Sequence, residues 1–138
     1  MKTLIVLLAI AVGSCTLSQA QNTGNISAQV TNLTSAEGEV LFALYTADKF
    51  MKQEPDFSGK ASITDGRAKV VFENVPAGTY AVVVLHDKNG NGRMDFDSSG
   101  MPMESFGTSG SNFQYGPPSW AEAKFDYEGG QKEVEIRL

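Results

Sequence analysis

Asp and Asn side chains occupy nearly every second position of the segment LHDKNGNGRMDFD, residues 85–97. They are Asp87, Asn89, Asn91, Asp95 and Asp97. Alternate residues of a tightly turning loop point inward together, so this spacing predicts converging side-chain oxygen atoms. Ca²⁺ takes about six to eight oxygen ligands, drawn from carboxylates, amides and backbone carbonyls. The segment is therefore predicted to bind Ca²⁺.

Residues 87–92 match the ordered pattern D-x-[DN]-x-[DN]-G of calcium-binding loops. In this alignment Arg93 offers its backbone carbonyl, and Asp95 is placed for a direct or water-mediated contact. Gly92 is expected to supply the sharp turn that a β-carbon would obstruct. Ca²⁺ is favoured over Mg²⁺ because Mg²⁺ tends to keep its water ligands.

The match departs from the pattern at its end. Ser98 stands where the pattern has a bidentate Glu. Asp97, one residue earlier, or Glu104, farther along the loop, would therefore complete the ligand shell. With so few carboxylates the expected affinity is weak, about 10⁻⁴ to 10⁻³ M.

Two other interpretations of this segment remain open. Asn-Gly pairs are favoured in tight turns without any metal, although two in succession flanked by carboxylates exceed what a turn needs. An enzyme would use His86 as a base oriented by Asp87, with a serine nucleophile. The candidate nucleophiles are Ser98, Ser99, Ser105 and Ser109. The sequence has no G-x-S-x-G motif, and no spacing supports this pairing.

The first twenty residues, MKTLIVLLAIAVGSCTLSQA, predict a secretory signal peptide with one positive charge, an apolar run and a small-residue end. The expected mature domain is residues 21–138, exported to the periplasm or secreted, with no transmembrane span. Alternatively, VGSC is a lipoprotein motif in which Cys15 carries the lipid. Cys15 is the only cysteine, which excludes an intramolecular disulfide.

The charge of the chain argues against nucleic-acid binding. Without Lys2 the chain has ten basic and sixteen acidic residues, and Lys and Arg form no cluster along the sequence. Nucleic-acid-binding proteins carry basic patches that neutralise phosphates. No nucleic-acid partner is therefore expected.

The elements that must position the loop are predicted to be β-strands, because apolar residues alternate with polar ones. Residues 25–33 and 39–46 predict a hairpin, and Asp65-Gly66 predicts a second hairpin turn. A third hairpin is predicted at Gly129-Gly130, with Val134, Ile136 and Leu138 facing inward. Residues 79–87 predict a strand that is buried on both faces. About seven short strands indicate an all-β immunoglobulin-like or transthyretin-like β-sandwich.

Residues 87–119 are predicted to be one long irregular segment, rich in Gly and Pro. Its aromatic residues, and one just beyond it, argue against disorder. They are Phe96, Phe106, Phe113, Tyr115 and Trp120. These rings either cover the open end of the sandwich or form a recognition surface for a sugar or a peptide.

Three segments, FENVPAGTYAVVVLHDKNGNGRMD, GMPMESFGTS and GPPSWAEAKF, follow one another in this order. Together they resemble the bacterial family named domain of unknown function 2141, in which a signal- or lipid-bearing leader precedes one β-rich domain. The resemblance covers roughly residues 25–138. The matching residues are Pro76, Gly78, Tyr80, His86, Asp87, Asn89, Asn91, Gly92, Asp95, Gly100, Pro102, Glu104, Gly107, Gly116, Pro117 and Pro118.

This resemblance implies a fold but no assigned activity. Its P-x-E motif accompanies the Asp/Asn loop, which supports Glu104 as the missing acidic ligand. The chain departs from the family at Ser105, Phe106 and Thr108, where Gly, Tyr and Phe are expected, and this puts in doubt any ligand contact made by that turn. The leading hypothesis is an exported cell-envelope binding or accessory module with a Ca²⁺-stabilised loop and an envelope ligand, carbohydrate or protein. An enzyme and a metal-free structural domain are the alternatives.

Overall fold

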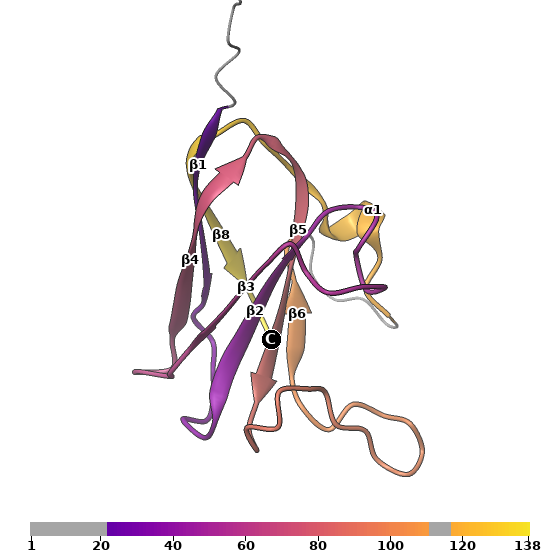
Figure 1. The fold of residues 1–138 in the computed structure, drawn as a ribbon. Coiled ribbons are helices and arrows are strands. Elements are labelled where there is room, and N and C mark those ends of the chain that lie inside the picture. Colours follow the sequence, from indigo (N-terminus) through magenta and orange to yellow (C-terminus); the bar gives the residue numbers. More distant parts are fainter. Residues whose placement is uncertain (1–21, 111–116) are drawn as a thin grey trace, which may run out of the picture.

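The computed structural model describes residues 22–110 and 117–138, which form two β-sheets packed face to face (Figure 1). The elements are β1 Thr23–Val30, β2 Glu39–Tyr45, β3 Phe57–Ala61, β4 Ala68–Pro76, β5 Gly78–Asp87, β6 Phe106–Thr108, α1 Trp120–Ala123, β7 Phe125–Tyr127 and β8 Gly130–Ile136. One sheet has the order β4-β1-β8. The other has the order β3-β2-β5-β6, and β7 pairs with the start of β5. The predicted β-sandwich is confirmed, with eight strands in the described residues.

The core lies between the two sheets because the strands alternate as predicted. In β1, Ile26, Ala28 and Val30 are fully buried. In β2, Val40, Phe42 and Leu44 are buried against them, whereas the intervening Leu41, Ala43 and Tyr45 lie half-buried on the opposite face. Successive side chains of a strand point to opposite faces, so one strand serves two surfaces.

The three predicted hairpins are wrong in their strand pairing. β1 lies between β4 and β8, and β2 lies between β3 and β5, so β1 and β2 belong to different sheets. β8 runs parallel to β1, and β7 pairs with β5, so the chain changes sheets near Gly129. The predicted Asp65-Gly66 turn does form, with positive φ at both residues, but β3 and β4 diverge from it into separate sheets. Alternation predicts which face is buried but not which strand is the neighbour.

The long segment 87–119 is less irregular than predicted, because it contains β6. Residues Phe106–Thr108 pair antiparallel with Val83–Leu85 of β5. Gly107 is required there, since a β-carbon would collide with the Arg137 carbonyl and with the Ile136 side chain. A strand of three residues is too short to produce a recognisable period in the sequence. β5 itself is buried along most of its length, as predicted.

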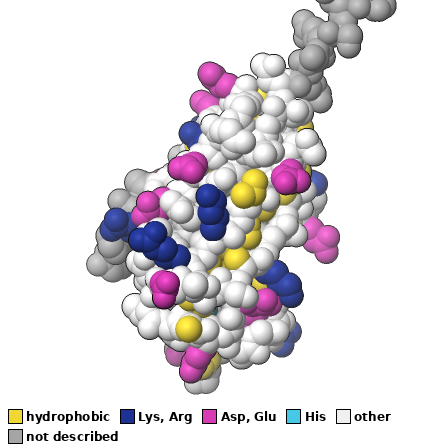
Figure 2. All heavy atoms as spheres, turned by 90° about the vertical axis from the view of Figure 1, so that its left-hand side faces the viewer, with side chains coloured by type: hydrophobic (Ala, Val, Ile, Leu, Met, Phe, Trp, Pro, Cys, Tyr) yellow, Lys and Arg dark blue, Asp and Glu magenta, His cyan; other side chains and the backbone are white. Residues whose placement is uncertain are grey.

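The short helix α1 lies beside β5 (Figure 1). α1 has four residues, and no helix in the described part of the chain is long and apolar enough to cross a membrane. The predicted leader 1–20 with Cys15 lies outside the described residues, as do Phe113 and Tyr115. On the side of the molecule that carries β4, basic and acidic side chains are scattered around a narrow hydrophobic band (Figure 2). Neither sign of charge gathers into a patch on the described part of this face.

Asp56 holds the connection between β2 and β3 in place. Its carboxylate is expected to stabilise the fold, and this stabilisation should be lost at low pH. Its Oδ2 accepts hydrogen bonds from the Thr46 backbone N–H and hydroxyl, both at 2.9 Å, and Lys49 Nζ lies 3.1 Å from its Oδ1. Burial alone would raise the pKa of Asp56, but these bonds and the Lys49 charge outweigh it and lower the pKa below its ordinary value of 3.8. Because the pKa of Asp56 is lower in the folded state than in the unfolded state, its ionised carboxylate stabilises the fold at pH values above 3.8. This stabilisation is lost as the pH falls from 3.8 through the pKa of the folded state.

We therefore expect Asp56→Asn to remove part of the acid dependence of unfolding, about 1 kcal/mol or less. The measurement is the unfolding free energy between pH 6 and pH 2, in urea, for the wild type and the variant. Asp126→Asn is the matched control, since the Asp126 carboxylate accepts a single bond from the Thr79 hydroxyl on the surface. Parallel curves for Asp56→Asn and the wild type would contradict the prediction.

Candidate functional site

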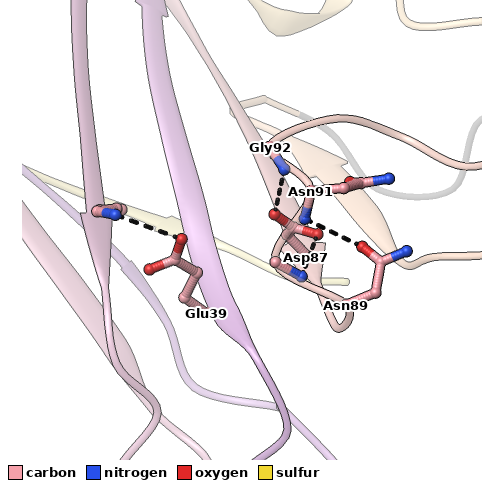
Figure 3. Close-up of polar contacts among 7 residues, drawn as sticks. Glu39, Asp87, Asn89, Asn91 and Gly92 are labelled. Carbon is pink, nitrogen blue, oxygen red and sulfur yellow. Dashed lines mark hydrogen bonds and ion pairs between the residues drawn. The ribbon is translucent and has the colours of Figure 1, made fainter.

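The loop that follows β5 is closed by the carboxylate of Asp87. This side chain is fully buried at the end of β5. Its Oδ1 accepts a hydrogen bond from the Gly90 N–H at 3.0 Å, and its Oδ2 accepts one from the Gly92 N–H at 2.8 Å (Figure 3). Glu39, the strand neighbour of Asp87, instead points away from the loop towards Lys60, whose Nζ lies 3.5 Å from Glu39 Oε1 (Figure 3). Asp87 therefore organises the loop, and Glu39 does not belong to it.

The two Asn residues continue the same pattern of local turns. Asn89 Oδ1 accepts a bond from the Asn91 N–H at 3.2 Å, and Asn91 Oδ1 accepts one from the Arg93 N–H at 3.1 Å. Their Nδ2 groups both donate to the carboxylate of Asp95, at 2.6 Å from Asn89 and at 2.7 and 2.9 Å from Asn91. The predicted ligands Asp87, Asn89, Asn91 and Asp95 are thus brought together in one turn.

The glycines of this loop are required by their backbone conformation. Gly90 has φ 71° and Gly92 has φ 79°, in the region that favours glycine. A β-carbon at Gly92 would meet no atom of a more distant residue within 4 Å, so the predicted obstruction is local and comes from the adjacent backbone at this positive φ. The conformational cost of positive φ for other residues is the reason for glycine at this position.

Glu104 and Asp97, the two candidates for the last acidic ligand, are placed very differently. Glu104 is 8% exposed, and its Oε1 accepts a hydrogen bond from the Lys88 N–H at 3.0 Å, directly beside Asp87. Its Oε2 is buried and has no hydrogen-bond partner among the described residues. A buried polar atom without a partner is costly and requires an explanation.

Asp97 lies outside this arrangement. Its Oδ1 accepts bonds from the Ser99 N–H at 2.8 Å, the Ser99 hydroxyl at 2.6 Å and the Met101 N–H at 3.0 Å. The carboxylate is exposed, and these hydrogen bonds, first the one from the Ser99 hydroxyl, lower the pKa of Asp97. Asp97 therefore organises a second turn, and its hydrogen bonds in the described residues are all made within residues 97–101.

The oxygen atoms of this loop are of the types that bind a hard cation such as Ca²⁺, although its carboxylates are not closely grouped. Within residues 22–110 and 117–138, no three Asp, Glu, His or Cys side chains lie together as a metal-binding group. A cation at this loop would therefore be held by a mixed set of carboxylate, amide and carbonyl oxygens, which is the set that Ca²⁺ accepts. The buried Oε2 of Glu104 is the acceptor that lacks a donor in this set.

Residues 28–135 match the model of a protein family described as "Uncharacterized protein conserved in bacteria (DUF2141)". The chain belongs to this family. The match begins within β1, ends within β8 and includes both the Asp87 loop and Glu104. A search of curated proteins and a search of solved structures gave no match. The resemblance stated from the sequence is confirmed.

His86 of this DUF2141 domain does not form a dyad with Asp87. The two side chains are consecutive in β5 and point to opposite faces of the sheet. His86 is 3% exposed on the core face, opposite Val40, and its Nε2 donates to the Glu37 carbonyl at 2.8 Å. His86 therefore joins the end of β5 to the segment that precedes β2.

Two of the candidate serine nucleophiles, Ser99 and Ser109, have hydroxyl groups that are bonded to other partners in the structure. The Ser109 hydroxyl is buried, donates to the Ala123 carbonyl at 2.7 Å and accepts a bond from the Val82 N–H at 2.8 Å. Ser105 accepts a bond from the His86 N–H through its backbone carbonyl at 2.9 Å. Ser109 thus joins β5 to α1, and the enzyme hypothesis has no assembled Ser-His pair among the described residues.

An apolar groove lies on the outer face of the β3-β2-β5-β6 sheet and was not predicted from the sequence. Its floor is formed by half-buried side chains of β2, β5 and β6, namely Leu41, Ala43, Tyr45, Val83, Leu85 and Phe106. One wall is the loop that follows Asp87, through Gly92, Met94, Phe96 and Met101. The groove has a volume of about 1310 Å³. The available signal was the segment EVLFALY, which is apolar on both faces.

The aromatic residues of the long segment are divided between packing and exposure. Trp120 packs edge-on against Phe50, with ring centroids 5.6 Å apart. Phe106 lies half-buried in the groove floor, and Phe96 is 59% exposed at its wall. Packing therefore accounts for Trp120, whereas Phe96 is available to a ligand.

Proposed function

We propose that this DUF2141 chain is an exported cell-envelope binding module whose Asp87 loop is stabilised by Ca²⁺. The export part of this proposal rests on the leader sequence 1–20, with lipid anchoring through Cys15 as the alternative. The ligands would be the side chains of Asp87, Asn89, Asn91, Asp95 and Glu104 with the Arg93 carbonyl. Asp97 is left out because it is bonded within its own turn.

Glu104 is the observation that carries the cation proposal. Its Oε2 is buried and has no donor among the described residues, and a buried acceptor without a partner costs about 1–3 kcal/mol. A cation beside the carboxylate would remove this cost, whereas a simple Asn-Gly turn gives no reason to bury a second carboxylate next to Lys88. Asp87 and Asp95, by contrast, already accept hydrogen bonds through both oxygen atoms.

An ion in the loop would also act on the groove. Gly92 donates its N–H to Asp87 and lines the groove as well. Met94 and Phe96, the next residues of that wall, follow it directly in the chain. Ordering of the loop by Ca²⁺ would therefore hold this wall in place over the sheet, which gives the ion a structural role in ligand binding.

Thermal unfolding of the purified protein, followed by circular dichroism in EDTA, Ca²⁺ or Mg²⁺, tests the cation. At a Ca²⁺ concentration near one hundred times the dissociation constant, we expect stabilisation by about 2.7 kcal/mol, or a midpoint rise of roughly 10 °C. The rise should be smaller in Mg²⁺. Glu104→Gln, which keeps the size of the side chain, should lose most of the Ca²⁺-dependent rise.

Asp97→Asn is the matched control and should keep the full rise, because its carboxylate serves a separate turn. An unchanged midpoint of the wild type in Ca²⁺ would overturn the cation proposal. An equal rise in Glu104→Gln and the wild type would remove Glu104 from the ligand shell.

A further inference from the structure

We propose that the groove on the outer face of the β3-β2-β5-β6 sheet binds a long-chain fatty acid, with the hydrocarbon chain along the sheet and the carboxylate beside Lys60. This inference rests on the proposed function for the role of the protein as a binding module, and it names the ligand. The floor of the groove is formed by β2, β5 and β6, and the Asp87 loop supplies one wall, so ligand binding can be measured with and without the ion.

The floor of the groove favours a hydrocarbon chain over a peptide or a sugar. It lies on β2 and β5, each of which is hydrogen-bonded to strands on both sides, so its backbone N–H and C=O groups are already used. A peptide laid across it would leave its own backbone groups without partners, and a sugar would leave its hydroxyls without them. Tyr45, Ser58 and Lys60 are the only lining residues in the described chain with polar side-chain atoms. A chain of methylene groups requires no such partners.

Lys60 supplies the charge that selects an anionic end group. It is the only charged residue that lines the groove within the described residues. Its side chain is 69% exposed, and its ammonium lies 3.5 Å from Glu39, a loose and solvent-accessible ion pair. In a chain with net charge −5, a cationic group at the edge of an apolar groove complements one carboxylate.

The rim of the groove has exposed and flexible apolar side chains that a ligand would cover. Met51, Phe96 and Met101 line it and are 54%, 59% and 62% exposed. Exposed apolar surface gathered at one place is typical of a binding site, and Met side chains adapt to chains of variable shape. A fatty acid chain would bury these side chains between itself and water.

Displacement of a fluorescent fatty acid by palmitate tests the inference. The titration is made in EDTA, because Ca²⁺ precipitates long-chain carboxylates. We expect saturable binding with one palmitate per chain. Met101→Glu, on the rim, should weaken it at least tenfold. Met103→Glu is the matched control, since Met103 is 64% exposed two residues away but does not line the groove. It should change the affinity by less than twofold.

Hexadecanol and Lys60→Gln test the anionic end. Hexadecanol should bind the wild type several-fold more weakly than palmitate, and Lys60→Gln should remove this difference. Equal effects of Met101→Glu and Met103→Glu, or no saturable palmitate binding, would overturn the groove as the site. So would displacement of the fluorescent probe by an apolar peptide or an oligosaccharide but not by palmitate, and so would a concentration-dependent dimer that excludes the probe.

The two proposals can fail separately. Palmitate binding in EDTA without a Ca²⁺-dependent rise in unfolding temperature would keep the groove and overturn the cation. A Ca²⁺-dependent rise lost in Glu104→Gln, without palmitate binding, would keep the cation and overturn the fatty acid.

Discussion

Replacement of Asp87 by Ala is expected to lower the free energy of unfolding by about 2–4 kcal/mol and to abolish the response to Ca²⁺. The carboxylate is fully buried and accepts two backbone N–H bonds, from Gly90 and Gly92, at the point where the loop leaves β5. Hydrogen bonds to a charged group contribute more than neutral ones, and both are lost together. Urea unfolding in EDTA measures the first effect, and thermal unfolding in Ca²⁺ measures the second.

Asp97→Ala is the comparison for this variant. It removes the same side chain from the same segment, but its carboxylate is exposed, so water replaces the lost bonds. We expect a much smaller loss of stability and an unchanged Ca²⁺ response. If Asp87→Ala is as stable as Asp97→Ala in EDTA, the loop does not depend on the Asp87 carboxylate, and the proposed cation loses its central ligand.

Leu44→Ala is expected to destabilise the protein by about 3 kcal/mol, or roughly 10 °C in the unfolding midpoint. Leu44 is fully buried between the two sheets, in contact with the core residues of both. Its truncation removes buried apolar area and leaves a cavity that a close-packed sandwich fills only in part. The measurement is urea unfolding. An unchanged slope of the unfolding free energy against urea concentration would show that the variant has lost stability without a change in the surface exposed on unfolding.

Leu41→Ala makes the same truncation three residues earlier in β2, on the opposite face of the sheet. Leu41 is half-buried in the floor of the groove. We expect a loss of about 1 kcal/mol in stability, from its smaller buried area, and a weakening of palmitate binding by several-fold. Leu44→Ala should leave the affinity of the folded protein nearly unchanged. The reverse pattern would mean that the faces of β2 have been assigned incorrectly.

The location of the Asp87 loop gives the two proposals a common physical basis. The loop begins at the end of β5, the strand that also forms part of the groove floor. One carboxylate, Asp87, lies on the groove side of this strand, and His86 lies on the core side with the Glu37 carbonyl. A substitution at His86 therefore tests the core, whereas one at Asp87 tests the loop.

Features that depend on residues close together in the chain could be predicted before the fold was known. Alternating apolar residues predicted strands and a sandwich, because side chains of a strand point to its two faces in turn. The Asp/Asn spacing predicted the loop, because Asp87, Asn89 and Asn91 bond to backbone N–H groups two to five residues ahead. The turn at Asp65-Gly66 was predicted for the same reason, since its conformation is local.

The contacts between distant segments could not be predicted in this way. The chain places β1 between β4 and β8, although the sequence suggested a hairpin with β2, because every buried strand face is compatible with several neighbours. The fold also gives Glu104 and Asp97 different partners. Glu104 accepts a hydrogen bond from Lys88, sixteen residues away in the chain, whereas Asp97 accepts bonds from residues no more than four positions away. The groove arises in the same way, from β2, β5, β6 and the loop wall together. Local hydrogen bonds are encoded by adjacent residues, but a surface shared by four segments exists only once they have packed.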